Sequence, residues 1–324
     1  MKNTTPHFLV ERPGVLSLIQ DAGRFGHTHL GLTHGGPADR FSFNWCHKLL
    51  GNALTCSAIE IIVGGLKLIS RCQTIGCVTG ATTQVTLNGK AVDMWCTFLI
   101  NAGDEIEIAY ASEGLRCYFA ISGGFDIEHE FGSCSTVLRE KIGGLSGAPL
   151  KQGDILPAIT GEHRDANTEH ESLSIDPKAI PDFGSLVTLR VVLGYQSDWF
   201  SKLDMQRFFT SCYKVSQQFD RMGYRLQGPK ITANKTEMLS EGITLGAIQI
   251  PADGQPIVLL NDRQTIGGYP KIGSVLSLDL DKLSQCKQGD SVCFEAISIE
   301  QAHNILHLDK HKQLRININK KARK

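Results

Sequence analysis

The highest density of side chains that could do chemistry lies in residues 219–226, with the sequence FDRMGYRL. If this run forms a strand, its residues alternate between two faces, so that Arg221 and Arg225 share one face while Asp220 and Tyr224 share the other. Two arginines on one face are suited to holding a carboxylate or a phosphate. The alternative is a ladder of salt bridges between strands, which requires no ligand.

A second polar run, NDRQTIGGYP, occupies residues 261–270 and directly follows the apolar segment IVLL. Residues that follow a buried strand lie at its end, where binding loops usually occur. The adjacent Gly267 and Gly268 let the backbone approach a ligand closely. We therefore predict that residues 220–269 line a ligand site. The alternative for this second run, as for the first, is a ladder of salt bridges between strands.

A third cluster, near the N-terminus, combines QDAGRFG at residues 20–26 with GLTHGGPAD at residues 31–39. Glycines beside Asp, Arg and His let the backbone curve around a ligand with its N–H groups exposed. The alternative is a pair of turns, with a local ion pair between Asp21 and Arg24 and with Asp39 capping a helix, and for Asp39 we expect the cap. The candidate substrate-binding residues of this cluster are Gln20, Asp21 and Arg24.

Two further candidates lie between these clusters. Glu60 is an acid inside the apolar run SAIEIIVGG, so it either faces solvent or is a buried carboxylate with a raised pKa. Ser133 belongs to FGSCST at residues 131–136, where hydroxyls and backbone amides are suited to cradling an anion. A hydroxyl-rich turn is an equally good interpretation of the second segment.

Strands must position most of these residues. The 33 glycines separate short runs rich in β-branched and aromatic residues, which is typical of strands. Gly-Asp pairs that each precede such a run predict tight turns. These pairs lie at residues 103–104, 153–154 and 289–290. Two helices are predicted, one over residues 38–50 and one that begins at an N-cap near Ser197 and runs through Phe208.

The length of 324 residues suggests two domains of roughly 150 residues each. The polar stretch at residues 161–182 lacks periodicity and is the predicted linker. Residues 109–125 and 249–269 share the order strand, glycine turn, strand and Gly-Gly-aromatic, and KQGD occurs at both 151–154 and 287–290. This echo fits two copies of one β-barrel-like unit.

Composition argues against several classes of protein. The 33 basic and 33 acidic residues balance, which gives no reason to expect nucleic acid as a partner, and the basic segment 309–324 is interpreted as a solvated end rather than a docking arm. No run approaches the ~20 apolar residues that span a bilayer, and the N-terminus lacks a signal-peptide pattern. We expect a cytoplasmic protein that does not bind membranes.

The ten cysteines include no C-x-x-C pair, and most lie in apolar runs. We therefore expect buried free thiols, with no disulfide, no zinc site and no other bound metal. The motifs G-x-x-x-x-G-K-[ST], G-x-S-x-G and H-E-x-x-H are absent, as is a biotin-attachment sequence of the Met-Lys-Met type. The chain thus has no recognisable means of binding ATP or carrying a prosthetic group by itself.

Several motifs occur in a specific order: VERPGVLSLIQDAGRFGHTHLGLTHGGPADRFSFNWCHKLLGN, SAIEI, GSCSTVLREKIGG, DRMGYRLQG and LLNDRQTIGGYPKIG. Together they resemble the biotin-dependent carboxyltransferase family, the group called allophanate hydrolase subunit 2 or KipA-like. The resemblance covers about residues 10–295. It implies a mainly β fold with two tandem cyclophilin-like β-barrel domains and a few short helices. The implied division is 1–160 and 183–308 for the barrels, 161–182 for the linker and 309–324 for the basic tail.

The resemblance also implies an activity. Family members include the C component of an ATP-dependent 5-oxoprolinase, which opens 5-oxo-L-proline to L-glutamate together with a KipI-like B component and a LamB/YcsF-like A component. ATP would then be bound by the complex. The alternatives are a carboxyltransferase component of a urea or allophanate pathway, which would use biotin, and a KipA-like regulator that binds a kinase inhibitor without catalysis.

Lactam opening suggests roles for the candidate residues. Arg221 or Arg225 would hold the substrate carboxylate, and backbone amides near Gly267 and Gly268 would stabilise developing negative charge. The expected catalytic residues are Asp220 and Asp262 for proton transfer and Tyr269 for completing the pocket. The expected substrate-binding residues are Arg221, Arg225, Gln264, Gly267, Gly268, Gln20, Asp21, Arg24, Glu60 and Ser133.

Overall fold

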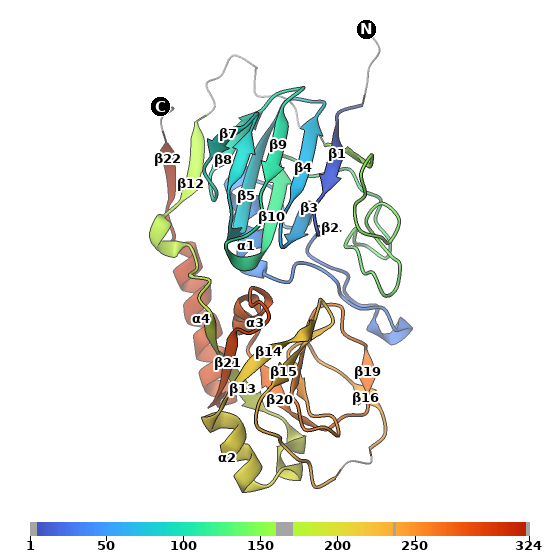
Figure 1. Ribbon diagram of the computed structural model, residues 1–324, viewed down its shortest axis with the longest axis vertical. Coiled ribbons are helices and arrows are strands. Elements are labelled where there is room, and N and C mark those ends of the chain that lie inside the picture. Colours follow the sequence, from blue (N-terminus) through green and yellow to red (C-terminus); the bar gives the residue numbers. More distant parts are fainter. Residues whose placement is uncertain (1–4, 160–170, 236–237, 322–324) are drawn as a thin grey trace. The chain divides into compact units, whose positions relative to one another are not determined.

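The structure, a computed structural model, describes residues 5–159, 171–235 and 238–321 (Figure 1). Over these residues the protein is mainly β and has four α-helices. Its contacts divide it into two units. Unit 1 comprises Met1–Phe25, Gly35–Asp182 and Ile316–Lys324, and unit 2 comprises Gly26–His34 and Phe183–Arg315. Within the described ranges, no helix combines the length and the apolar character needed to cross a membrane.

Unit 1 contains two large antiparallel sheets. The first has the strand order β11-β1-β4-β9-β6-β7 and the second the order β2-β3-β10-β5-β8. The strands of the first sheet are β1 (His7–Pro13), β4 (Leu66–Ser70), β6 (Val85–Leu87), β7 (Lys90–Val92), β9 (Glu105–Ile108) and β11 (Ile155–Pro157). Those of the second sheet are β2 (Leu16–Gln20), β3 (Ala58–Ile62), β5 (Thr74–Thr82), β8 (Thr97–Ile100) and β10 (Glu113–Ile121).

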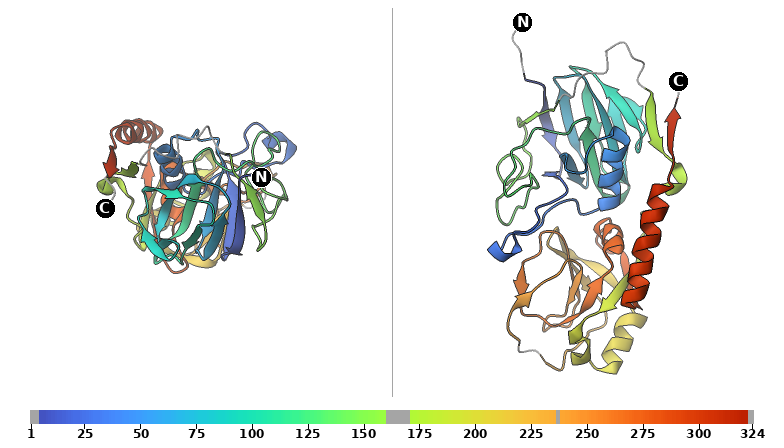
Figure 2. Two further views of the ribbon diagram at one scale, coloured as in Figure 1. Left: turned by 90° about the horizontal axis from the view of Figure 1, so that it is seen from above. Right: turned by 180° about the vertical axis from the view of Figure 1, so that it is seen from behind.

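Strand β10 is buried on both of its faces. Its odd-numbered residues Cys117, Phe119 and Ile121 belong to the main apolar core of the unit. On the opposite face lies helix α1 (Arg40–Leu50) (Figure 2). There the ring of Phe43 meets that of Tyr118 at a centroid distance of 5.9 Å. An apolar run without alternation is expected for a strand covered on both sides.

Helix α1 matches the helix predicted for residues 38–50. The side chain of Asp39 accepts a hydrogen bond from the backbone N–H of Ser42, and Gly51 ends the helix in the left-handed conformation at φ 71°. The predicted cap at Asp39 is confirmed. Both end signals are local in sequence, which explains why the prediction succeeded.

His47, in the last turn of α1, is fully buried, and its pKa is lowered by burial to about 4. In the unfolded chain, the imidazole has a pKa of about 6.5 and is protonated more readily than in the folded protein. The contribution of neutral His47 to the free energy of unfolding is therefore complete above about pH 6.5 and is lost as the pH falls. We expect the free energy of unfolding to drop by about 3 kcal/mol between about pH 6.5 and pH 4 on this account. Urea unfolding of wild type and His47→Leu across this range measures the effect. Identical pH profiles for the two proteins would contradict it.

Unit 2 is built on a closed barrel of seven strands in the order β13-β20-β17-β18-β15-β14-β21. All neighbours are antiparallel except β13 and β21, which are parallel. The barrel strands are β13 (Leu186–Leu193), β14 (Cys212–Phe219), β15 (Gly223–Gln227), β17 (Ala247–Gln249), β18 (Ile257–Leu259), β20 (Lys271–Val275) and β21 (Ser291–Ile297). The short strands β16 (Glu241–Gly242) and β19 (Ile266–Gly267) pair beside it.

Three helices accompany the barrel: α2 (Lys202–Thr210), α3 (Ser277–Ser284) and α4 (Ile299–Leu314). The helix predicted from Ser197 begins later than expected. Residues Tyr195–Trp199 form a 3-10 turn, and Ser201 caps α2 by accepting a hydrogen bond from the N–H of Asp204. Ser201, four residues after the predicted Ser197, therefore provides the N-cap.

The mainly β architecture is confirmed, and one closed barrel is present. The prediction of two tandem barrels is not confirmed, because the described strands of unit 1 form two large sheets and the separate pair β12-β22, and not one closed barrel. Strand composition cannot distinguish these cases, since closure depends on which edge strands pair.

The Gly-Asp turns are confirmed, and all three share one hydrogen-bonding pattern. In 101–104 the N–H of Asn101 donates to the Asp104 carboxylate at 2.7 Å, and Ser70 bonds both the N–H of Gly103 and the carbonyl of Asp104. In 151–154 and again in 287–290, the backbone N–H of the lysine donates to the aspartate carboxylate at 2.7 Å. The glycine N–H and the aspartate carbonyl then bond the same residue of a neighbouring strand, Val10 in the first case and Val215 in the second. The repeated KQGD sequence thus builds the same turn in both units.

The predicted linker and tail contain secondary structure. Residues 160–170 lie outside the described ranges, but β12 (Ser172–Ile175) follows them and pairs antiparallel with β22 (Ile318–Lys321). Helix α4 covers the beginning of the predicted tail, down to Leu314. The charges of this segment favour a solvated end, and they mask the apolar residues, such as Ile318, that enter the strand pair.

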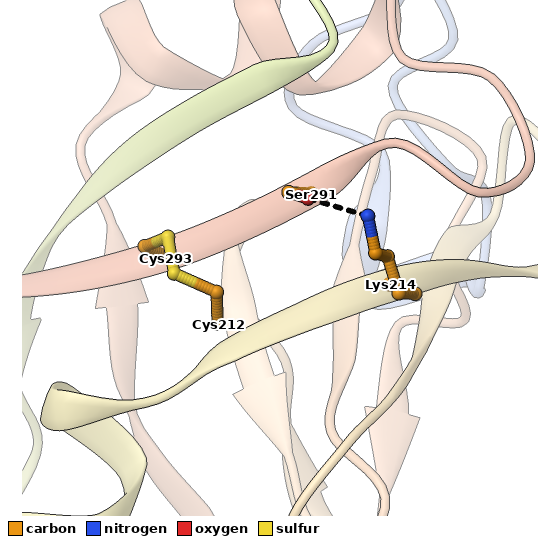
Figure 3. The surroundings of a disulfide bond; sticks show 4 residues. All are labelled: Cys212, Lys214, Ser291 and Cys293. Atoms are coloured by element: carbon orange, nitrogen blue, oxygen red, sulfur yellow. Dashed lines mark hydrogen bonds between the residues drawn. A yellow bond between two sulfur atoms is a disulfide. The ribbon is translucent and has the colours of Figure 1, made fainter.

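The prediction that all cysteines are free thiols is wrong for one pair. Cys212 and Cys293 are joined by a disulfide between β14 and β21, where they are directly opposite at a Cα–Cα distance of 4.4 Å (Figure 3). The other eight cysteines are free. No local pattern marks this pair, since the partners are 81 residues apart and only the strand register brings them together.

Candidate functional site

A cavity of about 520 Å³ in unit 2 collects several of the polar residues that were predicted to line a site. Residues from β14, β15, β17 and β18 line it, together with the loop that follows β18. Ile257 and Leu259 supply apolar surface. The lining residues that were predicted as site residues are Asp220, Arg225, Gln264 and Tyr269.

The segment that precedes β15 is a turn, so the predicted strand through residues 219–226 is wrong at its start. β14 ends at Phe219 and β15 begins at Gly223. The carboxylate of Asp220 accepts hydrogen bonds from the N–H groups of Met222 and Gly223 at 2.7 and 3.2 Å, which closes the turn. An aspartate that bonds the backbone two residues on is a strong turn former. Arg221 and Arg225 consequently do not share a strand face.

Arg221 and Asp262 form a buried, two-pronged ion pair. The Nε–Oδ2 and Nη2–Oδ1 distances are 2.9 and 3.0 Å, and each side chain is 5% exposed. The N–H of Asp262 also donates to the carbonyl of Arg221 at 2.9 Å. The two residues therefore fasten the loop after β18 to the turn before β15. Direct contact of either one with substrate stays a prediction.

Arg225 lines the cavity and forms an ion pair with Asp253. Its side chain is 27% exposed, so the guanidinium is open to solvent-borne ligands on one side. Gln264 and Tyr269 follow in the loop after β18, and Tyr269 is about half exposed. Gly267 lies in β19 opposite Glu241, and Gly268 comes directly after it.

Among the lining residues that the sequence did not predict, two are both polar and buried. Gln249 is the last residue of the otherwise apolar strand β17, and its polar side chain is buried. Arg263 is also buried and donates to the carbonyl groups of Ile243 and Leu260 at 3.2 and 3.3 Å. A lone polar residue at the end of an apolar strand, as in GAIQI, is the signal that would have identified Gln249.

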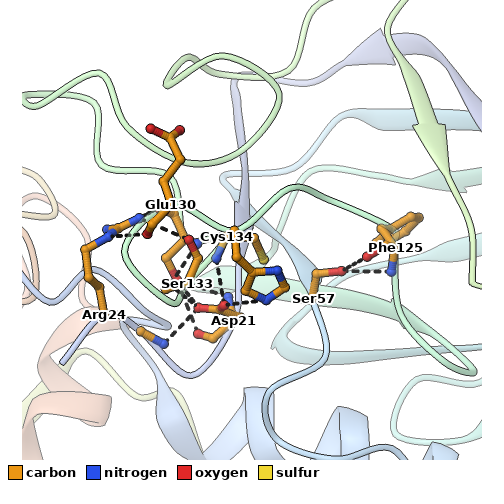
Figure 4. Close-up of polar contacts among 10 residues, drawn as sticks. Asp21, Arg24, Ser57, Phe125, Glu130, Ser133 and Cys134 are labelled. Carbon is orange, nitrogen blue, oxygen red and sulfur yellow. Dashed lines mark hydrogen bonds and ion pairs between the residues drawn. The ribbon is translucent and has the colours of Figure 1, made fainter.

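Three of the candidates from unit 1, Asp21, Arg24 and Ser133, belong to one polar cluster (Figure 4). The Asp21 carboxylate accepts hydrogen bonds from the hydroxyls of Ser133 and Ser135 at 2.6 and 2.7 Å, and from the N–H groups of Cys134 and Gly23 at 2.8 and 2.9 Å. Burial raises the pKa of Asp21, but these four donors outweigh burial and the pKa is lowered overall. The carboxylate therefore stays ionised and anchors the loop at 133–135.

Arg24 and Gln20 hold the same loop by its carbonyl groups. Arg24 is buried and donates to the carbonyls of Glu130, Ser133 and Ser135 at 3.1 to 3.3 Å (Figure 4). Gln20 donates to the carbonyl of Thr136 at 3.0 Å. The alternative offered by the sequence, a local ion pair between Asp21 and Arg24, is not what these contacts show, because both side chains instead bind the loop at residues 130–135.

Asp21, His129 and Cys134 each place a possible metal-ligand atom within 4.8 Å of the others. The Asp21 oxygens already accept four hydrogen bonds, however. Burial and the nearby Asp21 charge raise the pKa of the Cys134 thiol, which keeps the sulfur protonated, whereas a metal ligand must be the thiolate. The hydrogen bonds of Asp21 to the loop at residues 133–135 explain why these three side chains lie close together. The expectation that the protein binds no metal stays a prediction.

Glu60 is completely buried, so of the two interpretations offered by the sequence the buried carboxylate is confirmed. It accepts hydrogen bonds from the N–H of Ala38 at 2.9 Å and from the hydroxyl of Tyr118 at 2.7 Å, and the Arg116 guanidinium lies 3.8 Å away. Burial, and then the charges of Glu60 and Asp39, raise the pKa of Tyr118, which therefore remains a donor. This network fixes the entry to α1.

Comparison with known proteins gives consistent results. Residues 30–296 match the family described as carboxyltransferase domain, subdomain A and B. The C subunit of 5-oxoprolinase from Haemophilus influenzae is 34% identical over 302 residues, which cover 91% of this chain and 94% of that protein. The Escherichia coli protein of the same name is 35% identical over 293 residues, covering 90% and 91%. The crystal structure of K. lactis urea amidolyase superposes with a TM-score of 0.87 at 26% identity, over 96% of this chain and 20% of that one.

Proposed function

Because this chain belongs to the family of the carboxyltransferase domain, subdomain A and B, we propose that it is the C subunit of a 5-oxoprolinase, a hydrolase made of several subunits. The observation that carries this proposal is the cavity of unit 2, where arginine guanidinium groups and glutamine carboxamides line one space. Such a lining suits a small ligand that has both a carboxylate and an amide. Relatives with this name also match over about nine-tenths of both chains.

The proposed reaction is the opening of the lactam of 5-oxo-L-proline to L-glutamate with consumption of ATP. A lactam carbonyl is a resonance-stabilised amide, and ATP supplies its activation. We propose that the complex binds ATP and that a KipI-like protein and a LamB/YcsF-like protein complete it. The cytoplasmic location and a cyclophilin-like form for both units also remain predictions.

Within the cavity, Arg225 is the residue proposed to hold the substrate carboxylate, because its guanidinium lines the space and is partly exposed. Gln264 and Tyr269 contact the ring, and the backbone amides near Gly267 and Gly268 stabilise charge that develops on the carbonyl oxygen. Asp220 is the acid that lines the cavity and moves protons. Arg221 and Asp262 act as positioning residues, because their ion pair holds the loop that carries Gln264.

The test is co-expression of this chain with its two partner proteins, followed by purification through a tag on one of them. We expect co-purification, together with glutamate formation that depends on both ATP and 5-oxoproline. The isolated chain should form no glutamate, and it serves as the control. A purified complex of all three proteins that leaves 5-oxoproline unchanged would refute the proposal.

A carboxyltransferase of a urea pathway is the second candidate, and the superposition on K. lactis urea amidolyase favours it. That reaction requires biotin and bicarbonate. Turnover of urea by the same preparation, dependent on both, would replace the first proposal by the second.

A further inference from the structure

The cavity contains a buried amide group that has no hydrogen-bonding partner. Gln249 is 2% exposed, lines the cavity from the end of β17, and its Nε2 makes no hydrogen bond with any residue in the described part of the chain. A buried N–H group without a partner costs free energy, and folded proteins contain few of them. Such a group inside a cavity indicates that a ligand supplies the missing partner.

A second carboxamide approaches the same point. If residue 267 carried a Cβ, that atom would lie 3.0 Å from Nε2 of Gln249 and 3.1 Å from Nε2 of Gln264. It would also lie 2.5 Å from Cδ1 of Ile243. The backbone of Gly267 is not left-handed, so space and not conformation requires glycine here. The missing side chain leaves room for the two carboxamides to converge.

A glutamine carboxamide carries an N–H donor and a C=O acceptor along one edge. The edge of a cis amide, in which N–H and C=O lie on the same side, is its complement, and the two join through a pair of hydrogen bonds. A lactam ring holds its amide in this form, whereas peptide bonds in chains are almost always trans. Urea presents an equivalent edge.

We propose that Gln249 is a specificity-determining residue that reads the cis-amide edge of the substrate, with Gln264 beside it. The inference rests on the proposed function and adds to it the group that distinguishes a lactam from other small carboxylates. Arg225 lines the same cavity from β15, two strands away from Gln249, and holds the carboxylate of the same ligand, so acid and amide are recognised by different side chains. An isosteric lactone lacks the N–H and leaves the acceptor of the carboxamide unpaired.

The experiment compares the binding of 5-oxo-L-proline, its ring-oxygen lactone analogue and urea to the assembled complex, with wild-type chain, Gln249→Met and Gln227→Met. Gln227 is an exposed glutamine at the end of β15 that does not line the cavity, and it provides the matched control. We expect the wild type and the control to prefer lactam over lactone by at least about tenfold. In Gln249→Met this preference should fall to about twofold or less.

Stability separates this role from a structural one. Methionine removes the unpaired amide, so the Tm of Gln249→Met should equal or exceed that of wild type while selectivity is lost. If Gln249→Met keeps the preference for the lactam, the inference is overturned. If the wild-type complex still forms glutamate in that case, the proposed function survives. A complex that ignores 5-oxoproline but binds urea through Gln249 refutes the proposed function and supports cis-amide recognition. Binding of none of the three ligands overturns both.

Discussion

Asp262→Ala will lower the free energy of unfolding by about 3–5 kcal/mol, because it leaves the guanidinium of Arg221 buried without its counter-charge. Both side chains of this pair are 5% exposed, so water cannot replace the lost carboxylate. Arg221→Met together with Asp262→Leu should recover most of the loss, since an apolar pair of similar size leaves no charge unsatisfied. Denaturant unfolding of the two single variants and of the double variant measures these differences.

An exposed ion pair serves as the control. Arg12 and Glu107 are 2.5 Å apart, but their side chains are 50% and 39% exposed. Glu107→Ala should therefore cost less than about 1 kcal/mol. If Asp262→Ala lowers the free energy of unfolding no more than Glu107→Ala does, burial does not determine how much the Arg221–Asp262 pair contributes to stability. If the double variant is as unstable as the single variants, the geometry of the pair itself is required.

The second large effect concerns Arg225. Arg225→Met should raise the KM for 5-oxo-L-proline in the assembled complex by about 10- to 100-fold, because a hydrogen bond between charged groups contributes about 1.5–3 kcal/mol. The stability loss should be small, since the Arg225–Asp253 pair is partly exposed. Steady-state kinetics at saturating ATP gives the KM.

A lactam without a carboxylate, 2-pyrrolidinone, makes the test specific. Competitive inhibition by this compound should be equally weak for wild type and Arg225→Met, because the interaction removed by the substitution is one that the compound cannot make. Arg207 lies in the same unit, pairs with Asp204 and does not line the cavity, so Arg207→Met is the matched control. A larger KM change in Arg207→Met than in Arg225→Met would remove Arg225 from the site.

The features that sequence predicted correctly are local ones. The cap at Asp39, the stop at Gly51 and the turns at the Gly-Asp pairs each depend on residues within a few positions of one another. The segment at residues 261–270 was also placed at a strand end, and the structure puts it directly after β18. Local chemistry determines such features whatever the rest of the chain does.

The features that sequence missed, or left among its alternatives, depend on long-range pairing. Arg221 meets Asp262 across 41 positions, and Cys212 meets Cys293 across 81. Neither pair has a local signal, because strand register alone brings the partners together. The turn at Asp220 was missed for a different reason. Alternating residue types on both sides of it resemble one continuous strand, and only the aspartate bonding to its own backbone reveals the break.

In the sequence, most of unit 2 is an insertion between β12 and β22, two strands of unit 1 that pair with each other. Ile175 and Ile318 are direct partners in this strand pair, so the chain leaves unit 1 and re-enters it at adjacent positions, about 5 Å apart. A gap of this size can be closed by a two-residue hairpin turn. Excising residues 176–317 and joining the cut ends in this way yields a shortened protein that consists of unit 1. Residues 26–34 remain in it as a loop without the rest of unit 2. The same adjacency makes these positions suitable for grafting another protein's domain in place of the barrel.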